Sequence, residues 1–381
     1  MQSVAIGWYL YDRTGDAMAL AYAGLAVFLP IALFSLPGGD VADRVDRRWI
    51  LGTAHLAQAT GSLILVFLTL MRTEQTWPFY AVLAMAGTAR AFSAPAVQSL
   101  LPFLVPRERF PTAVAWSSSA QQSATVLGPA VGGLIYLAGA SASFAACSVA
   151  SLAVATCWFS IRARGGVAHA PGGGAVYRLL EGLRYLRVNR VLLGAISLDL
   201  FAVLLGSITA LLPIYARDIL SVGPDGLGIM RSSVAVGAVT MGLALAQLPA
   251  ARQAHAGAML FTGVAVFGVA ALAFGLSRSF LLSLAMLALT GAADMMSVFV
   301  RASVVQLGTP DEMRGRVTAV HSLFVGTANE LGDFRAGAVA AWLGAMPAVL
   351  AGGVATLAVV GLWAWLFPGL RRVERLADVK T

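Results

Sequence analysis

The stretch "GGDVADRVDRRWIL", residues 38–51, decides the fold because of what lies on either side of it. Six charges of alternating sign fall within nine of its positions, on Asp40, Asp43, Arg44, Asp46, Arg47 and Arg48. Residues 17–39 before this cluster and 49–71 after it carry no charge. A run of about 20 apolar residues crosses the hydrocarbon core of a bilayer as a helix. The stretch therefore predicts a short polar turn between two membrane-spanning helices.

The rest of the chain repeats this pattern. Hydrophobic residues make up 59% of its 381 positions, and the mean hydropathy is +0.80. A soluble globular protein needs far more polar surface. The sequence therefore predicts an all-α polytopic membrane protein. Twelve helical segments are expected, at 1–11, 17–38, 49–71, 78–99, 112–138, 142–161, 191–216, 226–248, 257–276, 280–303, 317–341 and 347–367.

The first of these segments is too short to span. At about 1.5 Å per residue, residues 1–11 cross roughly half of the bilayer. The segment is either a re-entrant stub or the end of a span that begins upstream. We expect a truncated first span, because the topology of the later segments requires a cytoplasmic N-terminus.

The positive charges predict the orientation. Alternate counting of spans puts 18 of the 26 Lys and Arg residues on one side and four on the other. Cytoplasmic loops are enriched in Lys and Arg. We therefore expect a multi-pass protein of the cell (inner) membrane with a cytoplasmic C-terminus, and the net charge of +8 needs no nucleic-acid partner. The basic segments are 38–48, 102–111, 162–190, 249–256, 304–316 and the tail after 368.

A Gly- and Pro-rich linker separates two halves of the chain. Its second part places Val176, Leu179, Leu180, Leu183 and Leu186 on one face of a helix, which predicts an amphipathic helix at the inner membrane surface. The predicted domains are a transmembrane bundle at 1–161, a cytoplasmic linker at 162–190, a second bundle at 191–367 and a cytoplasmic tail at 368–381.

The two halves share a sequence pattern. "AVQ" at 96–98 precedes "PRERFPTAVAWS" at 106–117, and "VVQ" at 304–306 precedes "PDEMRGRVTAVHS" at 310–322. The offset is near 205 residues, and it also relates the loop at 38–48 to that at 249–256. The common offset predicts a parallel duplication.

The charged turn is the first candidate functional site. Pro37, Gly38 and Gly39 are expected to end the preceding helix, because glycine adopts the left-handed conformation that terminates helices. Asp43 and Arg44 then lie where helix ends meet, so a carboxylate can bind a helix N-terminus and a guanidinium the last carbonyls of another helix. Such contacts can hold a cytoplasmic gate closed. The alternative is that the arginines serve only as topology anchors.

These residues resemble the inner-loop signature of the major facilitator superfamily. The matching pattern is Gly39-x-x-x-Asp43-Arg44 followed by Arg47-Arg48, although Asp46 stands where the superfamily usually has glycine. The resemblance continues in "SVAIGWYLYDRTGD" (3–16), "RAFSAPAVQSLLPFLVP" (90–106) and "ADMMSVFVRASVVQLGTPDEMRGRV" (293–317), and it points to the bacterial enterobactin-exporter-like and drug-efflux branch.

The resemblance implies a fold and a function. The implied fold is two six-helix bundles related by a pseudo-twofold axis along the membrane normal, with a substrate path between them. The implied function is alternating access that couples protons to the export of a small organic molecule, such as a siderophore or a drug. Small molecule, protons and bilayer are the expected partners, and the chain is expected to act as a monomer.

A second motif is "LGPAVGG", residues 127–133. Pro129 removes a backbone donor and bends the helix, while Gly128 and Gly132 allow another helix to approach. In the superfamily, a signature of this kind, here Gly128, Pro129, Gly132 and Gly133, implies an export-type antiporter. The family pattern often has two more glycines upstream of this motif, and this sequence has Ala115 and Ala124 in their place. The alternative is a packing motif without directional meaning.

Ionisable residues within predicted spans form the third candidate site, because each costs about 2.5–3.5 kcal/mol near the bilayer centre. Proton coupling by Asp199, Asp294, Glu330 or Asp333 competes with permanent salt bridges, such as Asp294 with Arg301 or Arg90. Arg231 and Arg301 are close enough to span ends that we expect their side chains to extend to the interface. The candidate residues are Arg90, Asp199, Asp294, Arg301, Glu330 and Asp333.

Other functions stay open at this stage. A nutrient importer on the same fold is one alternative, and a non-transporting membrane protein with an incomplete first span is another. No nucleophile–base pair, metal cluster or cofactor motif is present in the sequence, and Cys147 and Cys157 are ten residues apart in one span. We therefore expect no enzyme activity, no cofactor and no metal.

Overall fold

The computed structural model describes residues 1–106, 109–161, 175–247 and 255–371. Helices occupy most of each predicted segment, and no strand occurs within these described ranges. The expectations for the first part of the linker (162–174), most of the loop at 249–256 and the tail from 372 onward lie outside the described residues.

The helices confirm a polytopic membrane protein. Among the described residues, eight helices are long and apolar enough to cross a bilayer. These candidate spans are Ala17–Ser35, Arg47–Leu70, Ala140–Ser160, Arg190–Ile219, Pro224–Ala246, Ala256–Leu276, Phe280–Leu307 and Ala345–Leu366.

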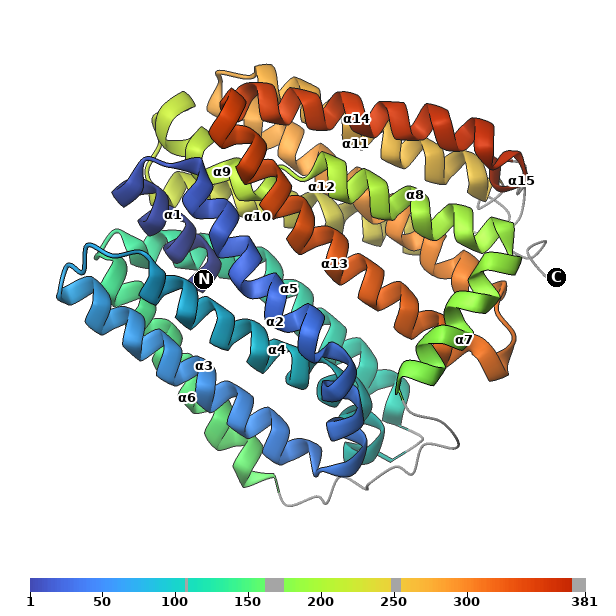
Figure 1. Ribbon diagram of the computed structural model, residues 1–381, viewed down its shortest axis with the longest axis horizontal. Helices are drawn as coiled ribbons and strands as arrows, with labels where there is room; N and C mark the ends of the chain where they lie inside the picture. The colour runs from blue at the N-terminus through green and yellow to red at the C-terminus, as the bar shows by residue number, and fades with distance from the viewer. Residues whose placement is uncertain (107–108, 162–174, 248–254, 372–381) are drawn as a thin grey trace. The chain divides into compact units, whose positions relative to one another are not determined.

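The chain folds as two compact units. Unit 1 comprises Met1–Gly15, Tyr22–Val176 and Pro224–Gly228. Within it α3 packs along α6 and α4 (Figure 1), and Phe79 and Phe144 lie fully buried in one apolar core. Its helices are α1 (Gln2–Thr14), α2 (Ala17–Arg44, whose first turn belongs to unit 2), α3 (Arg47–Leu70), α4 (Trp77–Leu104), α5 (Phe110–Tyr136) and α6 (Ala140–Ser160).

Unit 2 comprises Asp16–Ala21, Tyr177–Gly223 and Ile229–Thr381. Within it α11 packs between α12 and α14 (Figure 1), and α8 packs against α13 and α14. Its helices are α7 (Ala175–Val188), α8 (Arg190–Gly206), η2 (Thr209–Leu211), α9 (Leu212–Ile214), η3 (Tyr215–Ile219), α10 (Pro224–Ala246, whose first turn belongs to unit 1), α11 (Ala256–Leu276), α12 (Phe280–Leu307), α13 (Asp311–Leu343), α14 (Ala345–Leu366) and α15 (Pro368–Arg371).

The expected helix end at residues 37–39 was wrong. Helix α2 continues through Pro37 to Arg44. The reason is packing: a Cβ on Gly38 would lie 2.6 Å from the carbonyl oxygen of Ala91 in α4. Gly38 therefore serves close helix approach, not termination.

Equivalent glycines set the helix spacing in both units. A Cβ on Gly87 of α4 would overlap the carbonyl of Val27 in α2, and one on Gly291 of α12 would overlap the carbonyl of Val234 in α10. The two glycines are 204 positions apart and the two valines 207. The same kind of contact at similar offsets supports the predicted duplication.

Helix α7 is anchored on unit 2 along one side. Leu186 is fully buried, Glu181 forms an ion pair of 2.6 Å with Arg316, and the hydroxyl of Tyr185 donates to the carbonyl of Gly308. Within the predicted apolar face, Leu186 is buried and Leu180 is 58% exposed. Gly182 decides this orientation, since a Cβ there would lie 2.7 Å from the Arg316 carbonyl oxygen.

Candidate functional site

The charged turn joins helix ends through Asp46 and Arg48. The carboxylate of Asp46 caps α3 by accepting the backbone N–H of Arg48 at 3.1 Å, and it also binds the Arg48 guanidinium at 2.5 Å. The same guanidinium donates to the carbonyl of Ile161, which ends α6. The turn thus contains the carboxylate and guanidinium contacts expected of Asp43 and Arg44, but on different residues.

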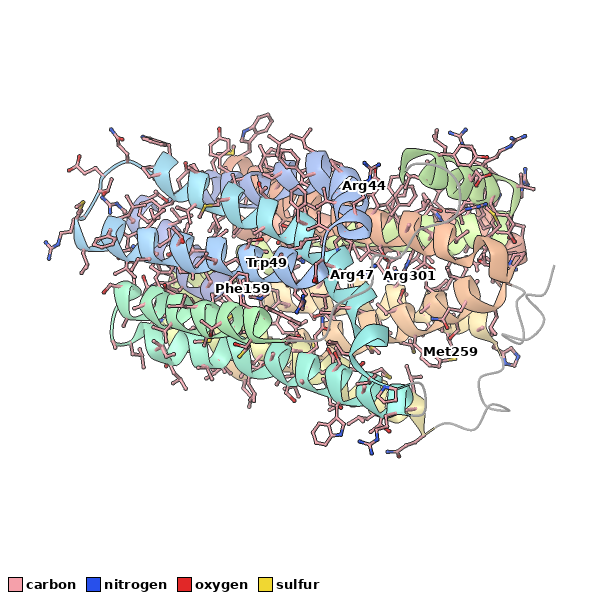
Figure 2. All side chains as sticks on the ribbon, turned by 90° about the horizontal axis from the view of Figure 1, so that it is seen from below. Arg44, Arg47, Trp49, Phe159, Met259 and Arg301 are labelled. Carbon is pink, nitrogen blue, oxygen red and sulfur yellow. The ribbon has the colours of Figure 1, made fainter. Side chains whose placement is uncertain are left out.

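The other residues of this turn have distinct surroundings. Arg47 is only 2% exposed, whereas Arg44 is exposed at the end of α2 (Figure 2). Gly39 lies within α2 with open space around it. The side chain of Asp43 is outside the described structure. Sequence reasoning treated Asp46 only as a departure from a pattern, although an Asp directly before an apolar helical run is an N-cap signal.

The electrostatics of the turn favour an ionised Asp46. Its hydrogen bond from the Arg48 side chain lowers the pKa of the Asp46 carboxyl below its ordinary value, and partial burial opposes this effect. The cap and the ion pair are therefore both present at neutral pH.

The glycines at 127–133 form a close backbone crossing within unit 1. A Cβ on Gly133 would lie 2.5 Å from the carbonyl oxygen of Pro224, and one on Gly228 would lie 2.7 Å from that of Pro129. A Cβ on Gly132 would lie 2.6 Å from Cα of Met1, and at Gly128 the nearest atom is 3.7 Å away. Pro129 lies inside α5. Packing against the first turn of α10 accordingly requires Gly133 and Gly228 to lack side chains.

A buried ion pair lies in unit 2. The guanidinium of Arg301 on α12 pairs with the carboxylate of Asp199 on α8, and the two side chains are 3% and 5% exposed. The expectation that Arg301 extends to the interface is therefore wrong, because a buried carboxylate neutralises it in place. The alternative pairing of Arg301 with Asp294 is not the one observed.

Asp294 nevertheless faces the same space as this ion pair. Asp199, Asp294 and Ser297 line an internal cavity of about 10 Å³, which is room for one water at most. Asp294, Ser297 and Arg301 follow the i, i+3, i+7 spacing of one helix face. Within unit 2 as described, neither the Asp294 carboxylate nor the buried hydroxyl of Ser297 has a hydrogen-bond partner. The Asp294 carboxylate therefore lines the same small space as Asp199, whose carboxylate is paired with Arg301.

A second polar cluster supports the break after α8. The helix ends at Gly206, and the freed carbonyls of Leu204 and Leu205 accept from the Arg335 guanidinium at 2.9 and 2.6 Å. The hydroxyl of Ser207 donates to the Asp333 carboxylate. Backbone groups at membrane depth need such partners. Asp333 is thereby placed at the break, and Arg335 is a residue that sequence reasoning did not single out.

The remaining candidates are dispersed. Glu330 is half-buried one turn before Asp333 on α13, and Arg90 is exposed on α4 of unit 1. Arg231 on α10 lies close enough to Asp333 for their opposite charges to interact. The ring of His321 on α13 is within electrostatic reach of Arg301. The structure therefore brings together Asp199, Asp294 and Arg301, and separately Asp333 with Arg231.

The geometry is that of a helical membrane protein with charges buried between spans, and comparison with known proteins gives its family. A major facilitator family model, described as transmembrane secretion effector, matches residues 1–379. The chain belongs to this family. It is a multi-pass membrane protein of the major facilitator superfamily.

Members of this superfamily with efflux names are similar in sequence. Macrolide efflux protein A of Streptococcus pyogenes is 29% identical over 246 residues, covering 64% of this chain and only 61% of that protein's length. The enterobactin exporter EntS of Shigella boydii is 23% identical over 330 residues, covering 86% of this chain and 76% of that protein.

Solved major facilitator transporters share the fold. A mutant of the nucleoside transporter NupG gives a TM-score of 0.75 at 13% identity, covering 96% of this chain and 94% of that one. A bacterial homologue of the lysosomal transporter Spinster, inward-facing and occupied, gives 0.71 at 14% identity, with coverage of 99% and 97%. These similarities confirm the predicted major facilitator fold of two six-helix bundles.

Proposed function

We propose that this transporter exports a small organic molecule, of the siderophore or drug-like class, by proton-coupled alternating access. The named efflux relatives support the direction and the substrate class. The positive-inside bias supports an orientation with the 38–48 turn and the C-terminus in the cytoplasm. The chain acts in the cell (inner) membrane and as a monomer in this proposal.

The observation that carries the coupling is a second acid, Asp294, in the cavity that the ion-paired Asp199 also lines. With Asp199 and Asp294 both ionised, the Asp294 carboxylate has no cationic partner in a space with room for one water at most, which costs free energy. A proton on either acid removes that cost. A proton on a carboxylate needs no additional room in a cavity of about 10 Å³, which supports a proton as the coupling ion. Binding of a proton to Asp294 and the pairing of Arg301 with Asp199 therefore depend on each other in this proposal.

This dependence gives a coupling cycle. When the proton sits on Asp294, Arg301 stays bound to Asp199 on α8 and ties α8 to α12. When Asp294 loses its proton, its charge competes for Arg301 from the same face of α12 and weakens that tie. Alternating access requires helix contacts that change with the bound proton. Asp333, with Ser207 and Arg231, is the second candidate carrier, while Glu330 and Arg90 remain candidates for the substrate path.

Two other motifs have proposed roles in the cycle. The turn that contains Gly39, Asp43, Arg44, Arg47 and Arg48 acts as the cytoplasmic gate, together with Asp46. The crossing at Gly128, Pro129, Gly132 and Gly133 is the export-type element, where side-chain-free contact lets α5 move against the first turn of α10.

Everted membrane vesicles test direction and coupling together. With a proton gradient imposed, we expect vesicles that contain the protein to accumulate a radiolabelled macrolide or enterobactin, and a protonophore should abolish the accumulation. Vesicles without the protein are the control. Accumulation that survives collapse of the gradient would exclude proton antiport. Uptake by intact starved cells would instead identify an importer, and no movement of either probe in either direction would contradict the proposed substrate class.

A further inference from the structure

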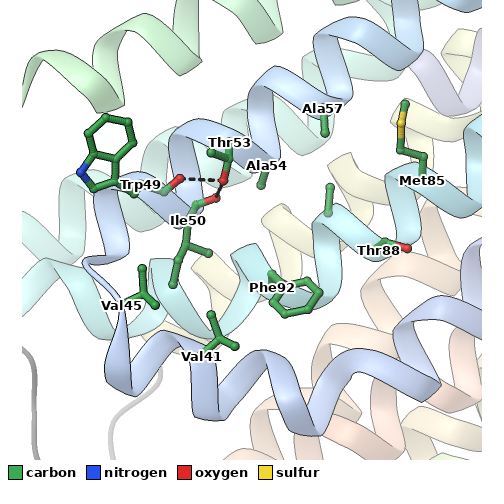
Figure 3. A pocket seen from close by; sticks show the side chains of 11 residues that line it. Val41, Val45, Trp49, Ile50, Thr53, Ala54, Ala57, Met85, Thr88 and Phe92 are labelled. Carbon is green, nitrogen blue, oxygen red and sulfur yellow. Dashed lines mark hydrogen bonds between the residues drawn. The ribbon is translucent and has the colours of Figure 1, made fainter.

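Unit 1 carries an apolar groove next to the charged turn (Figure 3). It has a volume of about 510 Å³ and lies between the end of α2, the beginning of α3 and the middle of α4. The walls include Val41 and Val45 of α2, Ile50 and Ala57 of α3, and Met85 and Phe92 of α4. None of the residues that line the groove is among the candidate transport residues.

The two hydroxyls that line the groove already donate within their own helices. The hydroxyl of Thr53 donates to the carbonyl of Trp49 at 2.7 Å, and that of Thr88 donates to the carbonyl of Ala84 at 2.9 Å. Each threonine thus satisfies its hydroxyl within its own helix and presents a methyl group to the groove. Because the other nine lining residues have aliphatic, aromatic or thioether side chains, the groove favours a hydrocarbon occupant.

The groove also has the direction and length of a lipid chain. From Trp49 to Ala57 the α3 wall covers about 12 Å at 1.5 Å per residue, close to one leaflet of a ~30 Å hydrocarbon core. Trp49, 59% exposed and in ring contact with Phe159 (Figure 2), lies at the end nearest the turn. An exposed Trp at a helix end marks the headgroup level.

The guanidinium of Arg44 lies at the same end of the groove, near the charged turn. Arg44 is exposed on α2, between the groove residues Val41 and Val45, and no hydrogen bond or ion pair of its guanidinium occurs among the described residues. The neighbouring arginines are not available in the same way, because Arg48 is held by Asp46 and Ile161 and Arg47 is buried. A guanidinium at the headgroup level matches a phosphate.

We propose that this groove binds one acidic phospholipid, with an acyl chain between α2, α3 and α4 and its phosphate on Arg44. The lipid bridges the end of α2 to α3 and α4, and therefore stabilises the helix that leads into the charged turn. This site does not depend on the transport direction or on proton coupling.

Native mass spectrometry of the purified full-length protein tests the site. Delipidated protein is titrated with phosphatidylglycerol or phosphatidylcholine, and the bound lipids are counted. Thr53→Phe fills the groove and is expected to remove one tightly bound phosphatidylglycerol. Thr156→Phe is the matched control, because Thr156 is also exposed with its hydroxyl bound to its own helix, on α6 outside the groove. Equal lipid retention by the two variants would overturn the proposal.

Arg44 separates headgroup recognition from chain burial. Arg44→Ala is expected to reduce the preference for phosphatidylglycerol over phosphatidylcholine about fivefold, the contribution of one basic residue near a lipid surface. Arg44→Lys should restore most of the preference. An unchanged preference in Arg44→Ala would contradict the phosphate contact.

A measurement on the unmodified protein covers the case in which Thr53→Phe fails to fold. Phosphatidylglycerol with a photoreactive acyl chain should label peptides that contain Met85 or Phe92. Labelling spread evenly over the lipid-facing helices would overturn the proposal.

Discussion

Two adjacent glycines show how position decides the role of a single residue. Gly38 contacts the backbone of α4 so closely that no Cβ fits, whereas a Cβ on Gly39 would meet no atom within 4 Å. The two residues looked alike in the sequence, and only Gly39 matched the superfamily signature. The tertiary contact, which no local pattern reports, distinguishes them.

Alanine substitutions at these two positions should therefore differ. Gly38→Ala should lower the free energy of unfolding by about 1–3 kcal/mol, because α2 and α4 must separate. Gly39→Ala should leave it unchanged or raise it by up to about 1 kcal/mol through helix propensity. Denaturant unfolding in micelles measures both. An equal loss in the two variants would show that Gly39 is needed for a conformation of the turn other than the helical one.

Asp46 gives the turn a pH dependence. Its folded-state pKa is lowered by the Arg48 hydrogen bond, so its contribution to stability is complete above the ordinary value of 3.8 and is lost as the pH falls through the lower folded value. Asp46→Asn should cost about 1 kcal/mol at neutral pH. The difference in melting temperature between wild type and variant should shrink in acid. A constant difference across the titration would contradict this origin.

At the scale of elements, α8 and α13 depend on each other. The span that begins with α8 breaks after Gly206, and α13 supplies the partners that the broken helix lacks. Ser207 and Asp333 make a second link across the same break. A break supported from one neighbouring helix is a site where the two parts of a span can bend without leaving backbone groups unsatisfied.

Removing the Arg335 guanidinium should therefore destabilise unit 2. Arg335→Ala leaves two carbonyls without donors, at about 1–3 kcal/mol each. Arg335→Lys should recover only part of the loss, because an ammonium does not reproduce the planar fork of arginine. Thermal unfolding with Arg217→Ala as the control measures this, since the Arg217 side chain is 38% exposed and its loss should matter little. A small effect of Arg335→Ala would mean that water replaces the guanidinium.

The elements were largely predictable, and their ends and breaks were not. Charge-free runs of bilayer length located the helices, because hydrophobicity over about 20 residues is a strong signal. The continuation of α2 past Pro37 and the break after Gly206 both depend on contacts with α4 and α13. Those contacts join residues distant in sequence, so helix-end signals alone gave the wrong limit for α2.

At the scale of the whole molecule, the same reasoning explains which site residues were found. Asp199, Asp294 and Arg301 stood out because charges are rare in apolar spans. The partner of Arg301 did not follow from spacing, since Asp199 is 102 positions away while Asp294 is seven. Only the packing of α8 against α12 identifies the pair, beside which Asp294 is the second acid of the proposed coupling site.

Substrate exchange and gradient-driven accumulation, compared in proteoliposomes that contain Asp294→Asn, test this coupling most directly. A neutral residue that cannot exchange a proton should leave exchange of a labelled macrolide near the wild-type rate and reduce accumulation driven by a proton gradient at least tenfold. Asp218→Asn, a change at a carboxylate that is 47% exposed, should alter neither. Accumulation by Asp294→Asn at the wild-type level, with Asp199→Asn behaving likewise, would contradict proton transfer at the Arg301 cluster.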